Sequence, residues 1–190
     1  MASRDLDYDE EAKKLFERLN LMNASTKPAI YNPMDPIWRD PKTGGTIFVG
    51  NQTAAANKSL LDSNGITHVV NCTDNMPQYH QNANTKAPIT YMRFPISFWM
   101  RHENQLPEFI RPLITFVDGA LAKGENVLVH CLAGAHRAGT TGCLLLMYKA
   151  GMPRMEAIRS AKKLRPVIDP IGGLPELLKR YEELRNAGKL

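Results

Sequence analysis

The sequence has no long apolar run. None of its 190 residues belongs to an unbroken apolar stretch near the ~20 residues that a membrane-spanning helix needs. The first residues, Met1 to Glu11, are acidic, whereas a secretory leader begins with a basic segment and continues with an apolar one. We therefore expect a soluble, intracellular protein without a membrane span.

Cysteine is scarce. The chain has three cysteines, Cys72, Cys131 and Cys143, which are widely spaced and include no Cys-x-x-Cys pair. An odd number with this spacing excludes a disulfide framework and a cysteine-based zinc site. The pattern predicts a reducing compartment, the cytoplasm or the nucleus, and at least one free thiol.

Internal repeats are absent, and so is any surface motif in which basic and aromatic residues are interleaved, so no nucleic-acid partner is expected. The net charge is +5 at pH 7 although acids gather near the N-terminus, and the remainder of the chain should therefore attract anionic substrates. With 43% apolar residues, the chain is long enough for one substantial core.

Two parts are expected along the chain. Apolar residues recur at helical spacing from Asp7 to Leu21 behind an acidic first turn, which predicts an amphipathic helix. Residues 27–45 are rich in proline, which predicts an extended segment without regular structure that wraps over the surface. Its expected anchors are Ile30, Tyr31, Ile37 and Trp38. We assign residues 1–45 to this N-terminal part and residues 46–190 to a single folded domain.

Short β-branched runs alternate with helical patterns after residue 45, which predicts an α/β fold: a central, largely parallel sheet flanked by helices on both faces. The helix over 140–148 is apolar nearly all round and should be buried at the centre. The predicted strands are Thr46–Val49, Thr67–Asn71, Tyr91–Ile96 and Asn126–His130, and the other predicted helices lie around 106–121, 155–161 and 174–184.

The richest motif lies between the last predicted strand and the central helix. Cys131 ends the strand, and Arg137 begins the helix after a tight loop. Consecutive backbone N–H groups in such a loop can surround a tetrahedral dianion at a helix N-terminus, provided that Gly134 and Gly139 supply unusual dihedral angles. Arg137 can close the site with a bidentate fork. The predicted phosphate-binding residues are Leu132, Ala133, Gly134, Ala135, His136 and Arg137.

The same loop suits nucleophilic catalysis by Cys131. The positive field of the amides, the helix and the arginine favours the thiolate, which lies below the phosphorus of a bound ester. In-line attack would give a cysteinyl-phosphate that water then hydrolyses, and the amides would stabilise charge on the equatorial oxygens. This scheme requires no metal and no organic cofactor.

The string His130-Cys131-x5-Arg137 resembles the signature loop of the cysteine-based protein tyrosine phosphatases, and the chain looks most like a compact dual-specificity phosphatase. The resemblance covers about residues 45–185 and implies that residues 46–190 are a phosphatase catalytic domain, monomeric, acting on phosphorylated proteins. His130, Gly139 and Thr140 would support the loop. The other matching segments are Ile47-Phe-Val-Gly-Asn51, Gly65-Ile-Thr-His-Val-Val-Asn71, Phe94-Pro-Ile-Ser97 and Arg165-Pro-Val-Ile-Asp-Pro170.

The chain departs from this family at the general acid, where Phe98 occupies the place of the usual aspartate. Three residues can replace it: His102, then Glu103, then Asp74 in the loop after Asn71. His102 ranks first because its reference pKa suits a donor at neutral pH, whereas Glu103 requires burial to raise its pKa.

Two further departures concern the second chemical step. Ala138 stands where the family usually has a serine or threonine, and Ile171 stands where an asparagine commonly assists water. Thr140 and Thr141 lie one turn further and can offer a hydroxyl, or can bond the preceding helical turn instead. Related glucan phosphatases also have alanine at this place.

Several other residues receive structural expectations. We expect His136 to face outward from the loop, and Lys162, Lys163 and Arg165 to lie on a solvated helix face. Phe98 and Trp99 would line or cover the substrate cleft. Cys72 is either a small buried thiol or a reversible disulfide partner of Cys131.

The leading hypothesis is an enzyme, a dual-specificity protein phosphatase acting on phosphotyrosine, phosphoserine and phosphothreonine. One alternative is a phospho-binding pseudophosphatase adaptor, favoured by Phe98, Ala138 and Ile171. Another keeps the chemistry and changes the substrate to a phosphoglucan, a phosphoinositide or an RNA 5′-phosphate.

Overall fold

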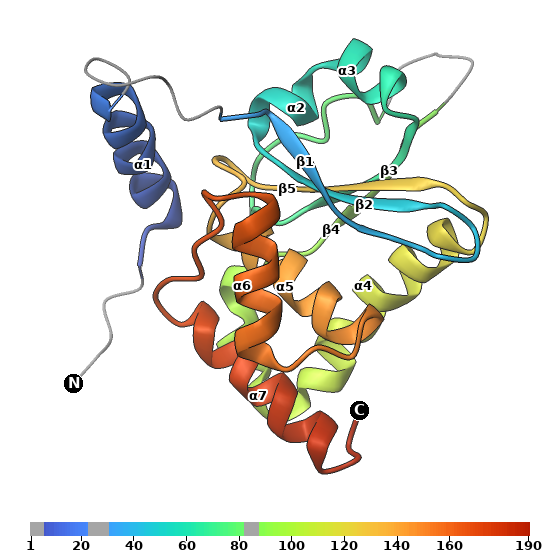
Figure 1. Cartoon of the computed structure of the whole chain (residues 1–190). Helices are drawn as coiled ribbons and strands as arrows, with labels where there is room; N and C mark the ends of the chain where they lie inside the picture. Colours follow the sequence, from blue (N-terminus) through green and yellow to red (C-terminus); the bar gives the residue numbers. More distant parts are fainter. Residues whose placement is uncertain (1–5, 23–30, 82–87) are drawn as a thin grey trace.

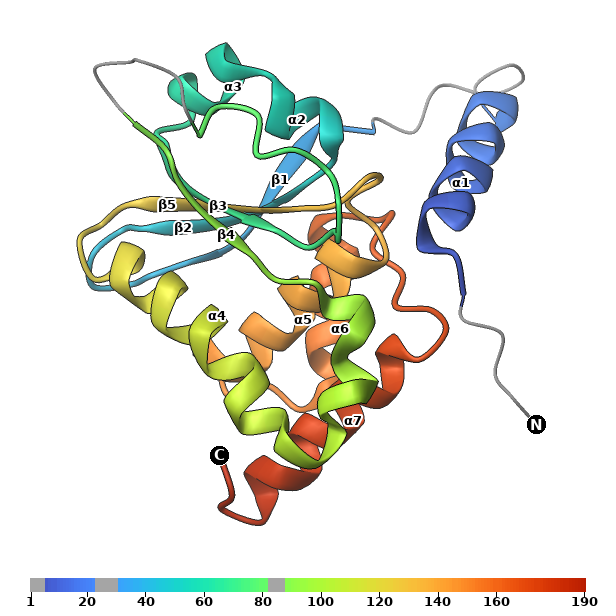
Figure 2. The same ribbon diagram turned by 180° about the vertical axis from the view of Figure 1, so that it is seen from behind.

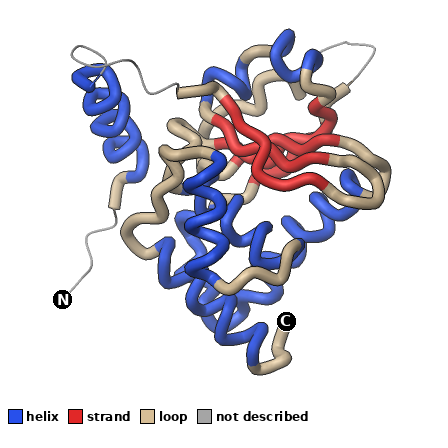
Figure 3. The backbone as a smooth tube through the Cα atoms, in the orientation of Figure 1, coloured by secondary structure: helices blue, strands red, loops and turns tan. Residues whose placement is uncertain are grey.

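A five-stranded sheet lies between two unequal groups of helices (Figures 1 and 3). The computed structural model describes residues 6–22, 31–81 and 88–190. The strand order is β1-β2-β5-β3-β4, in which β1 is antiparallel to β2 and the other neighbours are parallel. The predicted α/β class with a largely parallel sheet is confirmed. The strands are β1 (Met34–Arg39), β2 (Thr46–Gly50), β3 (Ile66–Asn71), β4 (Thr90–Arg93) and β5 (Asn126–His130).

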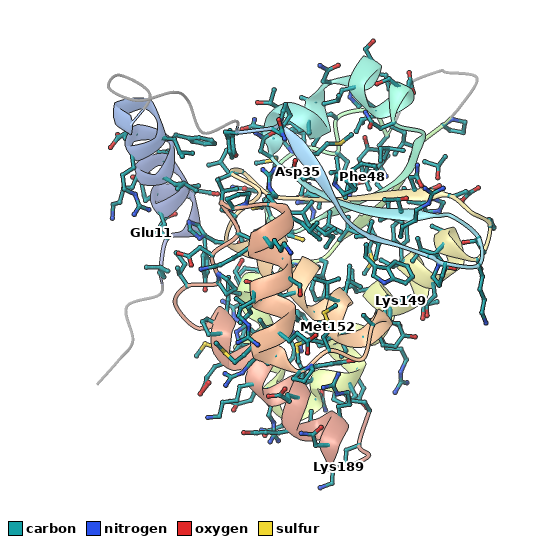
Figure 4. The ribbon with its side chains drawn as sticks, in the orientation of Figure 1. Glu11, Asp35, Phe48, Lys149, Met152 and Lys189 are labelled. Atoms are coloured by element: carbon teal, nitrogen blue, oxygen red, sulfur yellow. The ribbon has the colours of Figure 1, made fainter. Side chains whose placement is uncertain are left out.

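Alternate residues of the central strands face two different cores. On β5, Val127 and Val129 pack into the larger core, while Leu128 between them packs into the smaller one. This alternation follows from the period of two of a β-strand. Phe48 on β2 contacts the smaller core, on the side of the two short helices (Figure 4).

The larger core lies under four helices: α4 (Leu106–Leu121), α5 (Arg137–Lys149), α6 (Arg154–Leu164) and α7 (Leu174–Asn186). All four were predicted. Residues 137–147 of α5 are buried without exception, as expected for a central helix that is apolar nearly all round.

Two short helices on the other face, α2 (Gln52–Ala56) and α3 (Lys58–Ser63), were not predicted. Each begins at an asparagine whose side chain accepts a hydrogen bond from a backbone N–H in the first turn: Asn51 from Ala54 and Asn57 from Leu60. Helices this short have too few turns for a visible apolar period, so their capping residues were the available signal.

The prediction that residues 27–45 lack regular structure was wrong, because β1 forms there. Pro36 is tolerated since β1 is an edge strand, and the register shifts between Pro36 and Trp38. Ile37 is buried and Trp38 packs against the same core, as expected of anchors, whereas Ile30 lies outside the described residues. The boundary placed at residue 45 therefore leaves one strand of the sheet on its N-terminal side.

The segment before α4 also differs from its prediction. The expected strand over Tyr91–Ile96 ends at Arg93, and the residues after it, for which no helix was predicted, form a 3₁₀ helix, η1 (Ile96–Gln105). His102 has non-helical dihedral angles inside η1. This helix carries Phe98 and Trp99 to the carboxyl end of the sheet.

The N-terminal helix α1 (Tyr8–Met22) matches its prediction within one residue at each end. It stands beside the rest of the chain, next to the point where β5 continues into α5 (Figures 1 and 2). Within the described ranges, none of the helices combines the length and the apolar character that crossing a lipid bilayer demands.

Candidate active site

Cys131 follows β5 directly, and the loop that it begins leads into α5 at Arg137. Both side chains are nearly enclosed: Cys131 is 2% exposed and Arg137 is 4% exposed. Because β5 is the central strand, with parallel neighbours on both sides, the loop lies at the carboxyl end of the sheet, where open α/β folds place their ligands.

The carbonyl oxygens of the loop are all held from outside. The oxygen of Leu132 accepts from the N–H of Gln52 at 3.0 Å, and that of Ala135 accepts from the N–H of Asp169 at 3.0 Å. The His136 oxygen accepts from the hydroxyl of Thr140 at 2.6 Å. The N–H groups of residues 132–136 donate no hydrogen bond within the described part of the chain. The loop therefore turns its donors inward, as an anion-binding nest requires.

Arg165 holds the middle of the loop. Its Nε donates to the oxygen of Gly134 at 2.9 Å and its Nη2 to the oxygen of Ala133 at 3.4 Å. Its Nη1 is paired with Asp35 at 2.6 Å. The hydroxyl of Tyr31 donates to the same Ala133 oxygen.

The prediction of a solvated helix face was therefore wrong for Arg165, which is 1% exposed, although Lys162 and Lys163 are exposed. Arg165 terminates α6 with extended dihedral angles, so its side chain leaves the surface of that helix. A helical pattern cannot reveal this change of direction.

The two glycines of the motif have different roles. Gly134 has φ +63°, and a Cβ there would lie 2.5 Å from the backbone of Gly50, so the turn and the close approach both require glycine. Gly139 was expected to supply a second unusual dihedral angle, but it is not among the glycines with positive φ. Its function is close packing, since a Cβ there would lie 3.0 Å from Ile168.

The guanidinium of Arg137 makes an ion pair through Nη2 with Asp9 of α1. Burial opposes its charge, yet the nearby Cys131 and Asp9 together raise the pKa of Arg137 above its ordinary value. Its Nε finds no hydrogen-bond partner among the described residues. Arg137 is thus charged and keeps a buried donor for an anion.

The two loop histidines are buried. His136 was expected to face outward, but it is 4% exposed and its Nδ1 lies 2.7 Å from the oxygen of Asp169. His130 is fully enclosed, and burial lowers its pKa to about 4, against a smaller opposing effect of the Cys131 backbone. His130 is therefore neutral at physiological pH and supports the loop as a packed, uncharged ring.

The hydroxyls near the loop are engaged with the backbone. Thr140 bonds the oxygen of His136, and Thr141 bonds the oxygen of Arg137 at 3.0 Å. Thr141 also lies 3.4 Å from the sulfur of Cys72. Ala138 is fully buried, and its methyl side chain offers no hydroxyl at that position.

The three cysteines are free thiols in this structure. Cys72 is fully buried, and burial raises the pKa of its thiol well above the ordinary value. Burial also raises the pKa of Cys143 to about 12. Both are neutral, apolar parts of the core, so this arrangement favours the buried-thiol interpretation of Cys72 over the redox one.

A cleft of about 530 Å³ opens above Arg137. Phe98 and Trp99 line it, as predicted, and so does Asp74, whose carboxylate accepts a hydrogen bond from Ser97 at 3.3 Å. Residues 6–9, which precede and begin α1, form the opposite wall.

The structure places the three candidates for the general acid in different surroundings. His102 stacks on Phe109 with ring centroids 4.9 Å apart, and Glu103 lines a separate hollow with Lys179 and its neighbours. Of the three candidates, Asp74 alone lines the cleft with Arg137. Spacing along the sequence could not separate them, because it does not show which of the loop after β3 and the helix η1 directs a side chain into the cleft.

Two functional contacts were missed at the sequence level: Asp9 on Arg137, and Arg165 under the loop. The acidic first turn of α1 was recognised only as a helix start. The string Arg165-Pro-Val-Ile-Asp-Pro170 was recognised as a family segment without a role for its arginine. Each contact joins residues more than thirty positions apart or on separate elements, which a local pattern does not encode.

The comparisons with known proteins agree with this geometry. The model of the dual specificity phosphatase catalytic domain matches residues 47–183. Human dual specificity protein phosphatase 8 is 31% identical over 164 residues, which are 82% of this chain and 25% of that protein. Dual specificity protein phosphatase 1 of Arabidopsis thaliana is 28% identical over 137 residues, which are 72% of this chain and 66% of that protein.

Among solved structures, a mouse dual specificity phosphatase complexed with zinc tungstate superposes with a TM-score of 0.62 at 26% identity. The match covers 87% of this chain and 97% of the mouse chain. The chain spans only about a quarter of the human relative's length.

We predict that Gly134→Ala removes oxyanion binding, because the new methyl group meets the Gly50 backbone at 2.5 Å. Gly151→Ala is the matched control: Gly151 also has positive φ, but its Cβ would meet nothing within 4 Å. The control should lose about 1–2 kcal/mol of unfolding free energy because of its positive φ alone. Gly134→Ala should lose more unfolding free energy than the control. Urea unfolding measures the stability of each variant, and titration measures its tungstate affinity. Equal losses of stability in the two variants, with tungstate binding intact in Gly134→Ala, would refute the role of Gly134.

We predict a pH-dependent stability contribution from His130. Below pH 6.5 the His130 ring binds a proton in the unfolded chain but stays neutral in the folded protein, where its pKa is about 4. The free energy of unfolding therefore falls as the pH falls. Relative to His130→Gln, the wild type should lose about 3 kcal/mol of unfolding free energy between pH 6.5 and pH 4. Urea unfolding at each pH gives the two curves, and parallel curves would contradict the prediction.

Proposed function

The chain belongs to the dual specificity phosphatase family, and we propose that it hydrolyses phosphomonoesters on tyrosine, serine and threonine of proteins through a cysteinyl-phosphate intermediate. One observation carries this proposal: between Cys131 and Arg137 every loop carbonyl is held outward, which leaves the amides for an anion. The mouse relative solved with tungstate supports it, since tungstate is a tetrahedral oxyanion like phosphate.

Binding would place a phosphoryl group in the ring of amides, with two of its oxygens facing the guanidinium of Arg137. The unpartnered Nε of Arg137 supplies one donor of a bidentate fork. Cys131, at the base of the ring, is then positioned for in-line attack on phosphorus. The amides and Arg137 stabilise charge on the equatorial oxygens as the bond to the leaving oxygen lengthens.

Asp74 is proposed as the general acid in place of the residue that Phe98 replaces. Its carboxylic acid would give a proton to the leaving oxygen as the sulfur–phosphorus bond forms. As a carboxylate it would then take a proton from the water that attacks the cysteinyl-phosphate, which releases inorganic phosphate and restores the thiolate. Its position in the cleft with Arg137, and the hydrogen bond from Ser97, support this role.

Protein substrates suit the cleft, which has a volume of about 530 Å³ and is lined by Phe98, Trp99 and Met100 as well as by polar groups. The related proteins of human and Arabidopsis carry the name of protein phosphatases. The cytoplasm or the nucleus is the proposed compartment, because three widely spaced cysteines suit a reducing one. The monomeric state remains a prediction.

A phospho-binding protein that turns over slowly is the second candidate. It is favoured by Ala138, which is fully buried and leaves no hydroxyl beside the nucleophile. The binding part of the loop is complete in either case, so turnover rather than affinity separates the two functions.

We predict that Cys131→Ser abolishes hydrolysis of p-nitrophenyl phosphate and of a phosphotyrosine peptide, while tungstate affinity stays within about threefold of wild type. The serine hydroxyl lacks the nucleophilicity of a thiolate, and the amides and Arg137 are untouched. Phosphoenzyme trapping gives the direct evidence for the intermediate. Turnover retained in Cys131→Ser would exclude the cysteinyl-phosphate route, and a wild type that binds tungstate without turnover would establish the second candidate.

We predict that Asp74→Asn slows hydrolysis of phenyl phosphate by about 10²-fold, and that of p-nitrophenyl phosphate by much less, because a poor leaving group depends on protonation. The controls are His102→Ala and Glu103→Gln, which should leave this ratio unchanged. Steady-state kinetics on both substrates measure it. A leaving-group effect in either control, and none in Asp74→Asn, would assign the acid elsewhere.

A further inference from the structure

The helix α1 covers the phosphate-binding loop. Ala12, which is 2% exposed, packs with Ala133 and Ala135 of the loop, and Leu15 and Phe16 flank this contact. These small residues bring the helix close to the loop backbone. The enclosure of the loop and of Arg137 therefore involves a segment that precedes the residues matched by the family model.

The same helix brings a carboxylate to the phosphate clamp. Asp9 pairs with Nη2 of Arg137, whose side chain is 5% exposed, while the Asp9 side chain is 41% exposed. The ring of Tyr8 lies beside the pair, with its centroid 5.8 Å from the guanidinium carbon. Carboxylate and phosphate oxygens use the same guanidinium donors, so Asp9 and a substrate phosphate compete for Arg137.

Local interactions fix Asp9 in this position. The carboxylate of Asp7 caps the helix by accepting from the N–H groups of Asp9 at 2.9 Å and Glu10 at 3.1 Å. These bonds lower the pKa of Asp7, which therefore stays ionised at the positive end of the helix dipole. The first turn, which carries Asp9, is thus ordered by its own sequence.

The contact has the character of a reversible one. Apart from Tyr8, which packs against the edge of the larger core, the apolar cluster that joins α1 to the loop is separate from the two larger cores, so undocking α1 leaves the sheet and its other helices packed. Because α1 is part of the same chain as the loop, it acts at an effective concentration on the order of millimolar. A weak contact therefore suffices to compete with a substrate present at micromolar levels.

We propose that α1 is an autoinhibitory segment, in which the carboxylate of Asp9 occupies Arg137 and a phosphorylated substrate must displace the helix. This regulation acts on the proposed phosphatase site and rests on that proposal for its effect on turnover. Its effect on oxyanion binding requires only the loop and Arg137.

The test compares Asp9→Asn with Glu10→Gln in the full chain. Both remove one negative charge from the first turn of α1, but Glu10 is paired with Lys13 on the exposed side and does not contact Arg137. Asp9→Asn should tighten tungstate binding about tenfold and raise kcat/KM for p-nitrophenyl phosphate about tenfold, with Glu10→Gln unchanged. The fluorescence of Trp99, which lines the cleft, reports tungstate binding.

Ala12→Glu supplies an independent variant, because it disrupts the docking of α1 without changing the residue at position 9. It should also increase tungstate affinity and turnover. Unchanged or weaker tungstate binding in both Asp9→Asn and Ala12→Glu would overturn the proposal, as would an equal gain in Glu10→Gln. Tighter tungstate binding without turnover in any variant would uphold the autoinhibitory contact and refute the phosphatase proposal.

Discussion

The outward anchoring of six consecutive carbonyl oxygens, from Leu132 to Arg137, is the constraint on which the site depends. A peptide unit that points its oxygen to one side points its N–H group to the other, so each external donor orients one amide toward the anion. The donors come from α2, from the segment before β1, from the end of α6, from the segment between α6 and α7, and from the first turns of α5. Residues outside the loop therefore determine the shape of the proposed anion site.

Much of the fold could be predicted because its patterns are local. The buried helix α5 and the strand β5 contain continuous apolar runs, and the N-terminal helix α1 repeats its apolar residues at helical spacing. The nucleophile and the arginine clamp were predicted from one contiguous string. The edge strand β1 was not predicted, because Pro36 argues against a strand. The proline is tolerated there because β1 lies at the edge of the sheet.

The choice among the candidates for the general acid, and the residues that support the loop, required three-dimensional information. Asp74 follows β3 and His102 lies in η1, and the structure separates them by position: Asp74 lines the cleft with Arg137, whereas His102 stacks on Phe109 of α4. Arg165 looked like part of a basic surface because the bend that buries it comes after the helix ends. In each case the sequence shows the residue type but not the direction in which its side chain points.

The pairing of Arg165 with Asp35 bears on where the catalytic unit begins. Asp35 lies at the start of β1 (Figure 4), ahead of residue 47, where the family match starts. Tyr31 and the oxygen of Asn32, which also contact the loop or its arginine, lie still earlier. A fragment cut at the limits of sequence similarity would lose these supports together with an edge of the sheet, so the smallest complete catalytic unit begins no later than Tyr31.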